Sequence, residues 1–115
     1  MVFLGGGAGS VMRYLISTWV PYKEGNFPVA TLVANIVSSL ILGYLMGIVS
    51  RSGLMMEYRL LLMTGFCGGF STFSTFSAES LVLFQKGQIT MALTYIFMSV
   101  LLGIASIFIG VKLAT

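Results

Sequence analysis

The sequence has no histidine, no aspartate and only one cysteine, Cys67. These absences remove the usual components of metal clusters, histidine-dependent catalysis and disulfide frameworks, so we expect a protein that is not an enzyme. Charge is also scarce, because 8% of the 115 residues are charged, against about 25% in a soluble domain. Nine side chains that are charged at neutral pH cannot cover a globular surface. With a mean hydropathy of +1.02, the sequence predicts a membrane protein whose exterior mostly faces lipid.

The net charge of +3 does not come from a basic cluster. The cations are scattered, and most of them lie where an apolar run ends, as is typical of membrane boundaries. We therefore expect no nucleic-acid partner and a multi-pass location in the cell (inner or plasma) membrane. The six cations are Arg13, Lys23, Arg51, Arg59, Lys86 and Lys112.

Uncharged runs of 26, 19 and 25 residues cover 25–50, 60–78 and 87–111. Each run can hold a helix of roughly 20 residues, which crosses about 30 Å of hydrocarbon. The first segment is also long enough, although it carries Arg13. The sequence predicts an all-α membrane protein that forms one transmembrane domain over residues 1–115. Its four transmembrane helices are expected at about 2–20, 27–50, 55–84 and 88–112.

The third segment combines a glycine pair, Gly68 and Gly69, with a following run of hydroxyls and phenylalanines over 70–77. Glycine pairs beside Ser or Thr weaken a helix, so we predict a broken third helix at Gly68 to Ser71. The alternative is that the glycines allow close helix packing and the hydroxyls bond back to their own helix. Hydroxyls at 71, 72, 74, 75 and 77 surround the helix, which indicates that it lines a polar interior.

The charges give little bias for orientation in the membrane. If Arg13 is left out, the predicted loops place three cations on one side of the membrane and two on the other. The positive-inside rule therefore favours neither orientation clearly. Insertion in both orientations, and hence an antiparallel homodimer, is one interpretation, and a single fixed orientation is the other. The opposed groups are Arg51, Arg59 and Lys112 against Lys23 and Lys86.

Polar residues form a stripe along the second predicted helix, where Thr31, Asn35 and Ser38 lie within about 40° of one line. The Asn35 amide offers two donors without charge, so it can bind an anion without trapping it. A structural hydrogen bond between helices is the alternative. A weaker polar face on the fourth helix is formed by Tyr95, Ser99 and Ser106.

Phe73 and Phe76 lie one helical turn apart, and their positive ring edges can approach an anion, although ordinary packing is the alternative. Arg13 is the only cation well inside a predicted span, where it either attracts anions into a vestibule or extends to the membrane interface. Glu79 is expected to mark the end of the third span.

Three segments of the sequence resemble the signature segments of the Fluc (CrcB) fluoride channels. They are GGAGSVMRY at 6–14, TLVAN at 31–35 and GFCGGFSTFSTF at 65–76. The resemblance covers the whole chain in order, and the third motif is highly specific. It implies a dual-topology antiparallel homodimer of four-helix subunits with two fluoride pores and a central structural sodium ion.

The resemblance also assigns roles by position. The pore residues would be Asn35, Phe73 and Phe76, with Ser74 and Thr75 as neighbouring hydroxyl donors, Arg13 as the vestibule cation, and the Gly68 and Ser71 carbonyls as sodium ligands. Family members commonly have threonine in the place of Ser71, which matters little if the carbonyl is the ligand. The register of the fourth helix is less securely aligned.

The function implied is passive, fluoride-selective export across the cell membrane, which relieves fluoride toxicity. Fluoride is strongly hydrated, so a selective pore must replace its water with uncharged donors, which this sequence supplies. One alternative is a small four-helix multidrug or cation exporter, which requires a carboxylate in the first helix, where this chain has Arg13. A structural membrane subunit is the other alternative.

Overall fold

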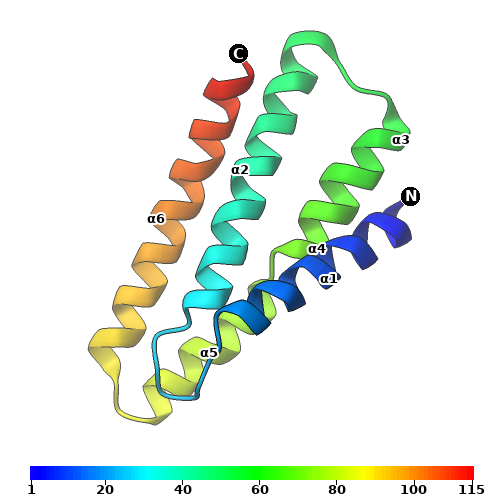
Figure 1. Cartoon of the computed structure of the whole chain (residues 1–115). Coiled ribbons are helices and arrows are strands. Elements are labelled where there is room, and N and C mark those ends of the chain that lie inside the picture. The colour runs from blue at the N-terminus through cyan, green and yellow to red at the C-terminus, as the bar shows by residue number, and fades with distance from the viewer.

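The computed structural model describes all 115 residues, and its regular structure is entirely helical. The prediction of an all-α chain with four helical segments is confirmed (Figure 1). Each segment ends within two residues of its predicted bounds. The segments are α1 (Val2–Trp19), α2 (Val29–Ser52), a composite third segment, and α6 (Ile89–Ala114).

The third segment consists of α3 (Met56–Tyr58), a π-helix η1 (Arg59–Cys67), α4 (Gly68–Phe70) and α5 (Phe73–Gln85). Between α4 and α5, Ser71 and Thr72 have extended backbones, with ψ angles of 160° and 119°. The expectation of a break that starts at Gly68 is therefore wrong, because Gly68 and Gly69 are helical. A Cβ at Gly69 would collide with the backbone of Gly6, so this glycine permits close packing against α1.

Glycines also set the approach of α1 to the third segment. A Cβ added at Gly5 would collide with the Leu61 carbonyl, and one at Gly9 with the backbone of Phe66 and Phe70. Only glycine allows two helices to meet backbone to backbone in this way. Because of this contact, α1 lies across the third segment in Figure 1, next to the extended residues.

Helices α2 and α6 run side by side along the length of the molecule (Figure 1). Their contact depends on Gly43 of α2 and Gly110 of α6, whose added Cβ atoms would collide with the backbones of Ile107 and of Leu40, respectively. The contact holds α6 close enough to α2 for polar groups on the two helices to face a common space.

Replacing Gly110 with alanine is expected to destabilise the protein by about 1–3 kcal/mol, because the added methyl group meets backbone that cannot move aside. Gly103→Ala is the matched control on the same helix, since its Cβ would meet nothing nearer than the Ser39 hydroxyl oxygen at 4.0 Å. Thermal unfolding in detergent measures both. Equal midpoints for the two variants would contradict the backbone contact.

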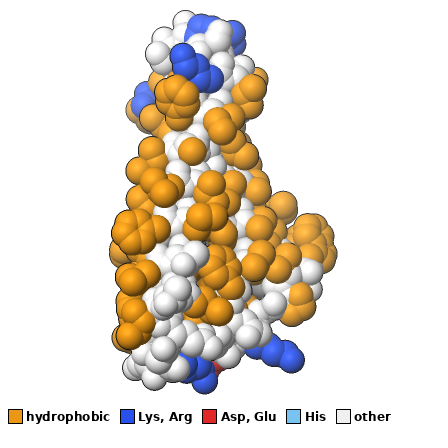
Figure 2. Space-filling model, turned by 90° about the vertical axis from the view of Figure 1, so that its left-hand side faces the viewer, with side chains coloured by type: hydrophobic (Ala, Val, Ile, Leu, Met, Phe, Trp, Pro, Cys, Tyr) orange, Lys and Arg blue, Asp and Glu red, His pale blue; other side chains and the backbone are white.

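Apolar side chains cover the middle of the molecule, and Lys and Arg side chains gather at its two ends (Figure 2). Only 22 of the 115 residues are buried, so most apolar side chains point outward. By length and hydropathy, α2 and α6 can each cross a membrane. The distribution of side chains is therefore that of a protein with a lipid-facing belt between two polar ends.

Candidate functional site

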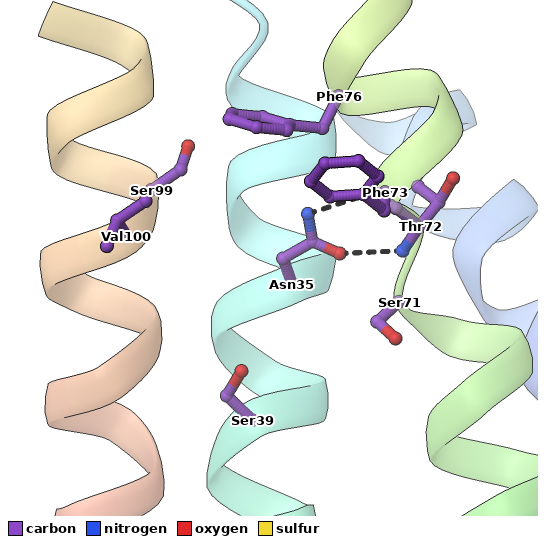
Figure 3. A pocket seen from close by; sticks show the side chains of 8 residues that line it. All are labelled: Asn35, Ser39, Ser71, Thr72, Phe73, Phe76, Ser99 and Val100. Atoms are coloured by element: carbon purple, nitrogen blue, oxygen red, sulfur yellow. Dashed lines mark hydrogen bonds between the residues drawn. The ribbon is translucent and has the colours of Figure 1, made fainter.

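A polar groove of about 260 Å³ lies beside the interruption between α4 and α5 (Figure 3). It is open on one side, and no charged side chain lines it. Helices α2 and α6 and the start of α5 form its walls. The lining residues are Asn35, Ser39, Ser71, Thr72, Phe73, Phe76, Ser99 and Val100.

The Asn35 amide is held in one orientation by the extended backbone of Thr72. Asn35 Oδ1 accepts a hydrogen bond from the Thr72 N–H at 2.9 Å, and Asn35 Nδ2 donates to the Thr72 carbonyl at 3.4 Å. The N–H can bond only to an oxygen, which fixes which end of the amide faces it. Since Nδ2 carries two hydrogens, one donor remains for a ligand in the groove.

The interruption forms because side chains replace the helical hydrogen bonds. The Thr72 N–H bonds Asn35 Oδ1 instead of the Gly68 carbonyl, and the Thr75 N–H bonds Thr72 Oγ1 at 3.2 Å instead of the Ser71 carbonyl. Thr72 is thus the N-cap of α5, and a hydroxyl at this position stabilises a helix start. As a result, the Gly68 and Ser71 carbonyls both lack the donors that a continuous helix would supply.

Two phenyl rings border the groove on the α5 side (Figure 3). The Phe73 and Phe76 ring centroids are 5.9 Å apart, and the Phe76 and Tyr95 centroids are 5.1 Å apart. Phe73 is 79% exposed, whereas Tyr95 is completely buried. Packing within one chain therefore accounts for the position of Phe76 but not for the exposed ring of Phe73.

A second pocket, of about 330 Å³, contains Arg13. The guanidinium Nε is buried without a hydrogen-bond partner, although Thr75 and Glu79 line the same pocket. An arginine that stays charged and keeps free donors raises the local concentration of anions. Thr72 lines this pocket as well as the groove, so both spaces border the interruption.

Glu79 connects three helices rather than ending one. Thr31 Oγ1 donates to Glu79 Oε2 at 2.9 Å, and the Tyr95 hydroxyl donates to Glu79 Oε1 at 3.0 Å. Helix α5 continues past Glu79 to Gln85, close to the predicted helix end at 84, and Glu79 as the end of the membrane span stays a prediction. The carboxylate joins α2, α5 and α6 at one side of the interruption.

The structure brings only some of the sequence-predicted residues into the groove. Asn35, Phe73, Phe76 and Ser71 line it, but Ser74 and Thr75 do not. Thr75 lies in the pocket of Arg13, and Ser74 borders an open depression beside Glu24 and Glu79. Gly68 is exposed and lies outside the groove.

On the fourth helix, Ser99 lines the groove, whereas the Ser106 hydroxyl bonds back to the Leu102 carbonyl of its own helix. Sequence reasoning missed the double role of Thr72 as helix cap and partner of Asn35. A threonine directly before an apolar helical run was the signal available for the cap.

Comparison with known proteins identifies close relatives along the full chain. A family model described as "CrcB-like protein, Camphor Resistance (CrcB)" matches residues 1–111. Relatives named "Fluoride-specific ion channel FluC" include one from Pyrococcus furiosus, 46% identical, with 99% of this chain and 93% of the relative covered. Those from Phocaeicola vulgatus and Agrobacterium fabrum are 44% and 43% identical, covering 96% and 98% of this chain and 93% and 92% of the relatives.

Proposed function

The chain belongs to the CrcB-like family, and from that membership and the groove geometry we propose that it is a fluoride-selective ion channel. It is a multi-pass protein of the cell membrane, and its proposed role is to let fluoride leave the cell passively. The relatives are named as channels, and we propose no catalytic activity. A cation exporter is disfavoured because Arg13 is the only charged side chain of α1.

The observation that carries the proposal is the orientation of Asn35 in a groove without charged side chains. Fluoride holds its water tightly, so a pore must offer donors in exchange and must avoid a fixed cation that would retain the ion. The free Nδ2 hydrogen of Asn35, the unpartnered hydroxyl of Ser99 and the ring edges of Phe73 and Phe76 are donors of that kind. Arg13 lies in the neighbouring pocket, where it attracts anions without blocking the groove.

Fluoride efflux from liposomes tests the function directly. Purified protein is reconstituted into vesicles loaded with potassium fluoride, and a potassium ionophore provides the counter-ion path. We expect rapid fluoride release and very slow release from vesicles loaded with potassium chloride, because chloride gains less from closely placed donors. Comparable rates for the two anions would overturn the proposal, and proton-coupled efflux of cationic dyes would favour an exporter.

The functional unit that we propose is an antiparallel homodimer. An open groove lined by an amide and hydroxyls cannot face hydrocarbon, so it needs a protein surface to cover it. The highly exposed Phe73 at its edge is similarly without cover in the single chain. A second copy inserted the opposite way supplies such a surface, and the near balance of boundary charges permits that insertion.

Cysteine labelling tests this topology. In a background that lacks Cys67, a single cysteine at Lys23 or at Arg51 is expected to react with a membrane-impermeant reagent from both faces of the cell membrane. The two positions lie at opposite ends of α2, so each variant is the other's control. Labelling of each position from one face only would contradict dual topology.

We further propose that a sodium ion is held at the interruption by the backbone carbonyls of Gly68 and Ser71. The donor set fits, because both carbonyls have lost their helical donors and hard oxygen ligands suit a small cation. A bound sodium would supply positive charge near the groove without a side chain. Two side chains keep these carbonyls available. Asn35 Oδ1 accepts from the Thr72 N–H and Thr72 Oγ1 accepts from the Thr75 N–H, so neither N–H bonds to the carbonyl four residues earlier.

A further inference from the structure

Ser38 is a buried serine whose hydroxyl bonds to a different segment of the chain. Its side chain is 2% exposed, and Ser38 Oγ donates to the Cys67 carbonyl at 2.9 Å. The other two buried serines, Ser80 and Ser106, donate to carbonyls four residues earlier in their own helices. A serine inside a helix usually donates to a carbonyl of its own helix, so the bond from Ser38 to the Cys67 carbonyl of another segment needs a separate explanation.

The acceptor of this bond, the Cys67 carbonyl, is the last one before the interruption to keep its helical donor. It accepts from the Ser71 N–H at 3.0 Å and from Ser71 Oγ at 2.9 Å, in addition to Ser38 Oγ. Ser38 is thus a third donor to an oxygen that is already satisfied. Its loss would leave no unpaired buried acceptor, so the bond contributes little to satisfying the backbone.

Ser38 and Asn35 lie on the same face of α2 and hold the two ends of one segment. Ser38 lies three residues after Asn35, which is a rise of about 4.5 Å along the same helix face. Ser38 holds the carbonyl at the end of the helical run, and Asn35 holds the N–H and carbonyl of Thr72 beyond it. The segment from Cys67 to Thr72 is therefore attached at both ends to one rigid helix.

We infer that Ser38 is a positioning residue for anion selectivity, and this inference rests on the proposed channel function. Ser38 fixes the Cys67 carbonyl, at the start of α4, against α2, and this contact fixes where Thr72 meets Asn35. The free Asn35 donor and the Phe73 ring that follows Thr72 take their positions from that contact. Without Ser38, α4 can shift along α2, and the donors no longer match a small anion. Ser38 itself does not contact the ion, because it does not line the groove.

The test replaces Ser38 with alanine, which removes the hydroxyl and little volume. We expect the ratio of fluoride to chloride efflux to fall about tenfold. A displacement of about 1 Å at a functional group can lower a rate by as much as 100-fold, and the loss of one of the two attachments to α2 should displace the Asn35 donor by less than that. Thermal stability in detergent should fall by no more than the loss of one hydrogen bond allows. Ser106→Ala is the matched control, since it also removes a buried serine hydroxyl but leaves the interruption untouched. It should keep the ratio of the unmodified channel.

Ser38→Thr and Ser38→Val form a second pair with nearly the same shape, and only threonine keeps the donor. Rescue of selectivity by threonine but not by valine is expected, and this pair decides the question if Ser38→Ala does not fold. An unchanged ratio in Ser38→Ala, or equal ratios in the threonine and valine variants, would overturn the inference.

Cys67 provides a readout that does not involve fluoride. Its side chain is 3% exposed, so a thiol reagent reaches it only when the segment opens. Loss of the Ser38 bond should raise the labelling rate about fivefold, the change that follows from one lost hydrogen bond. If the unmodified protein does not conduct fluoride, the channel proposal fails, while this labelling still reports on the anchor, by which we mean the hydrogen bond from Ser38 to the Cys67 carbonyl. An unchanged labelling rate would contradict the anchor itself.

Discussion

Asn35→Asp is expected to abolish fluoride flux and to leave the folded protein intact. Aspartate keeps an oxygen for the Thr72 N–H, so the shorter of the two bonds that hold Thr72 survives, whereas the 3.4 Å bond to the Thr72 carbonyl is lost. It loses both Nδ2 donors and adds a negative charge at the groove. Two like charges about 4 Å apart repel by about 4 kcal/mol at an effective dielectric of 20, which corresponds to a roughly 1,000-fold loss of flux.

The control for this substitution is Asn26→Asp, because Asn26 is the only other asparagine and is exposed between α1 and α2. It introduces the same charge outside the groove and should conduct normally. Liposome efflux measures the flux, and size-exclusion chromatography with thermal unfolding measures assembly. Near-normal flux in Asn35→Asp would make Asn35 a purely structural link between α2 and Thr72.

The amino-acid pattern was sufficient for the helices, because long uncharged runs bounded by cations leave few other solutions. It was not sufficient for the position of the interruption. Gly68 and Gly69 have a low helix propensity, but the backbone of Gly6 on α1 lies where a side chain of Gly69 would be. The glycines therefore serve tertiary packing, which a local pattern does not reveal, and the helix ends two residues later.

The residue types of the candidate site could be predicted from the sequence, but the directions in which the α5 side chains point could not. Asn35, Phe73 and Phe76 lie in one groove, as a polar stripe and an aromatic pair near a break suggest. Ser74 and Thr75 belong to the same motif, yet they face away from the groove because Thr72 begins α5 and sets its rotation. The start of a helix decides which of its residues share a face, and that start depended on a side chain of α2.

Phe73→Ile and Phe76→Ile are expected to reduce fluoride flux far more than they reduce stability. Isoleucine keeps most of the apolar bulk, so a packing role predicts a loss of less than about 1.5 kcal/mol. Phe76 should lose more stability than Phe73, because its ring packs against the buried Tyr95 and an aromatic pair contributes about 0.5–1.5 kcal/mol. Phe73 is largely exposed within the chain, so its ring has little packing to lose.

If ring edges form part of the anion path, both substitutions should lower fluoride flux strongly, even where they cost little stability. Without the ring, the positive edge of its quadrupole is gone, and a dehydrated fluoride has no equivalent donor at that point. The measurement is the initial fluoride efflux per amount of reconstituted protein, set against thermal stability in detergent. Phe97→Ile is the matched control, because Phe97 lies on α6, is 64% exposed and does not line the groove. If both variants conduct like Phe97→Ile, Phe73 and Phe76 are ordinary packing residues and the ion passes without them.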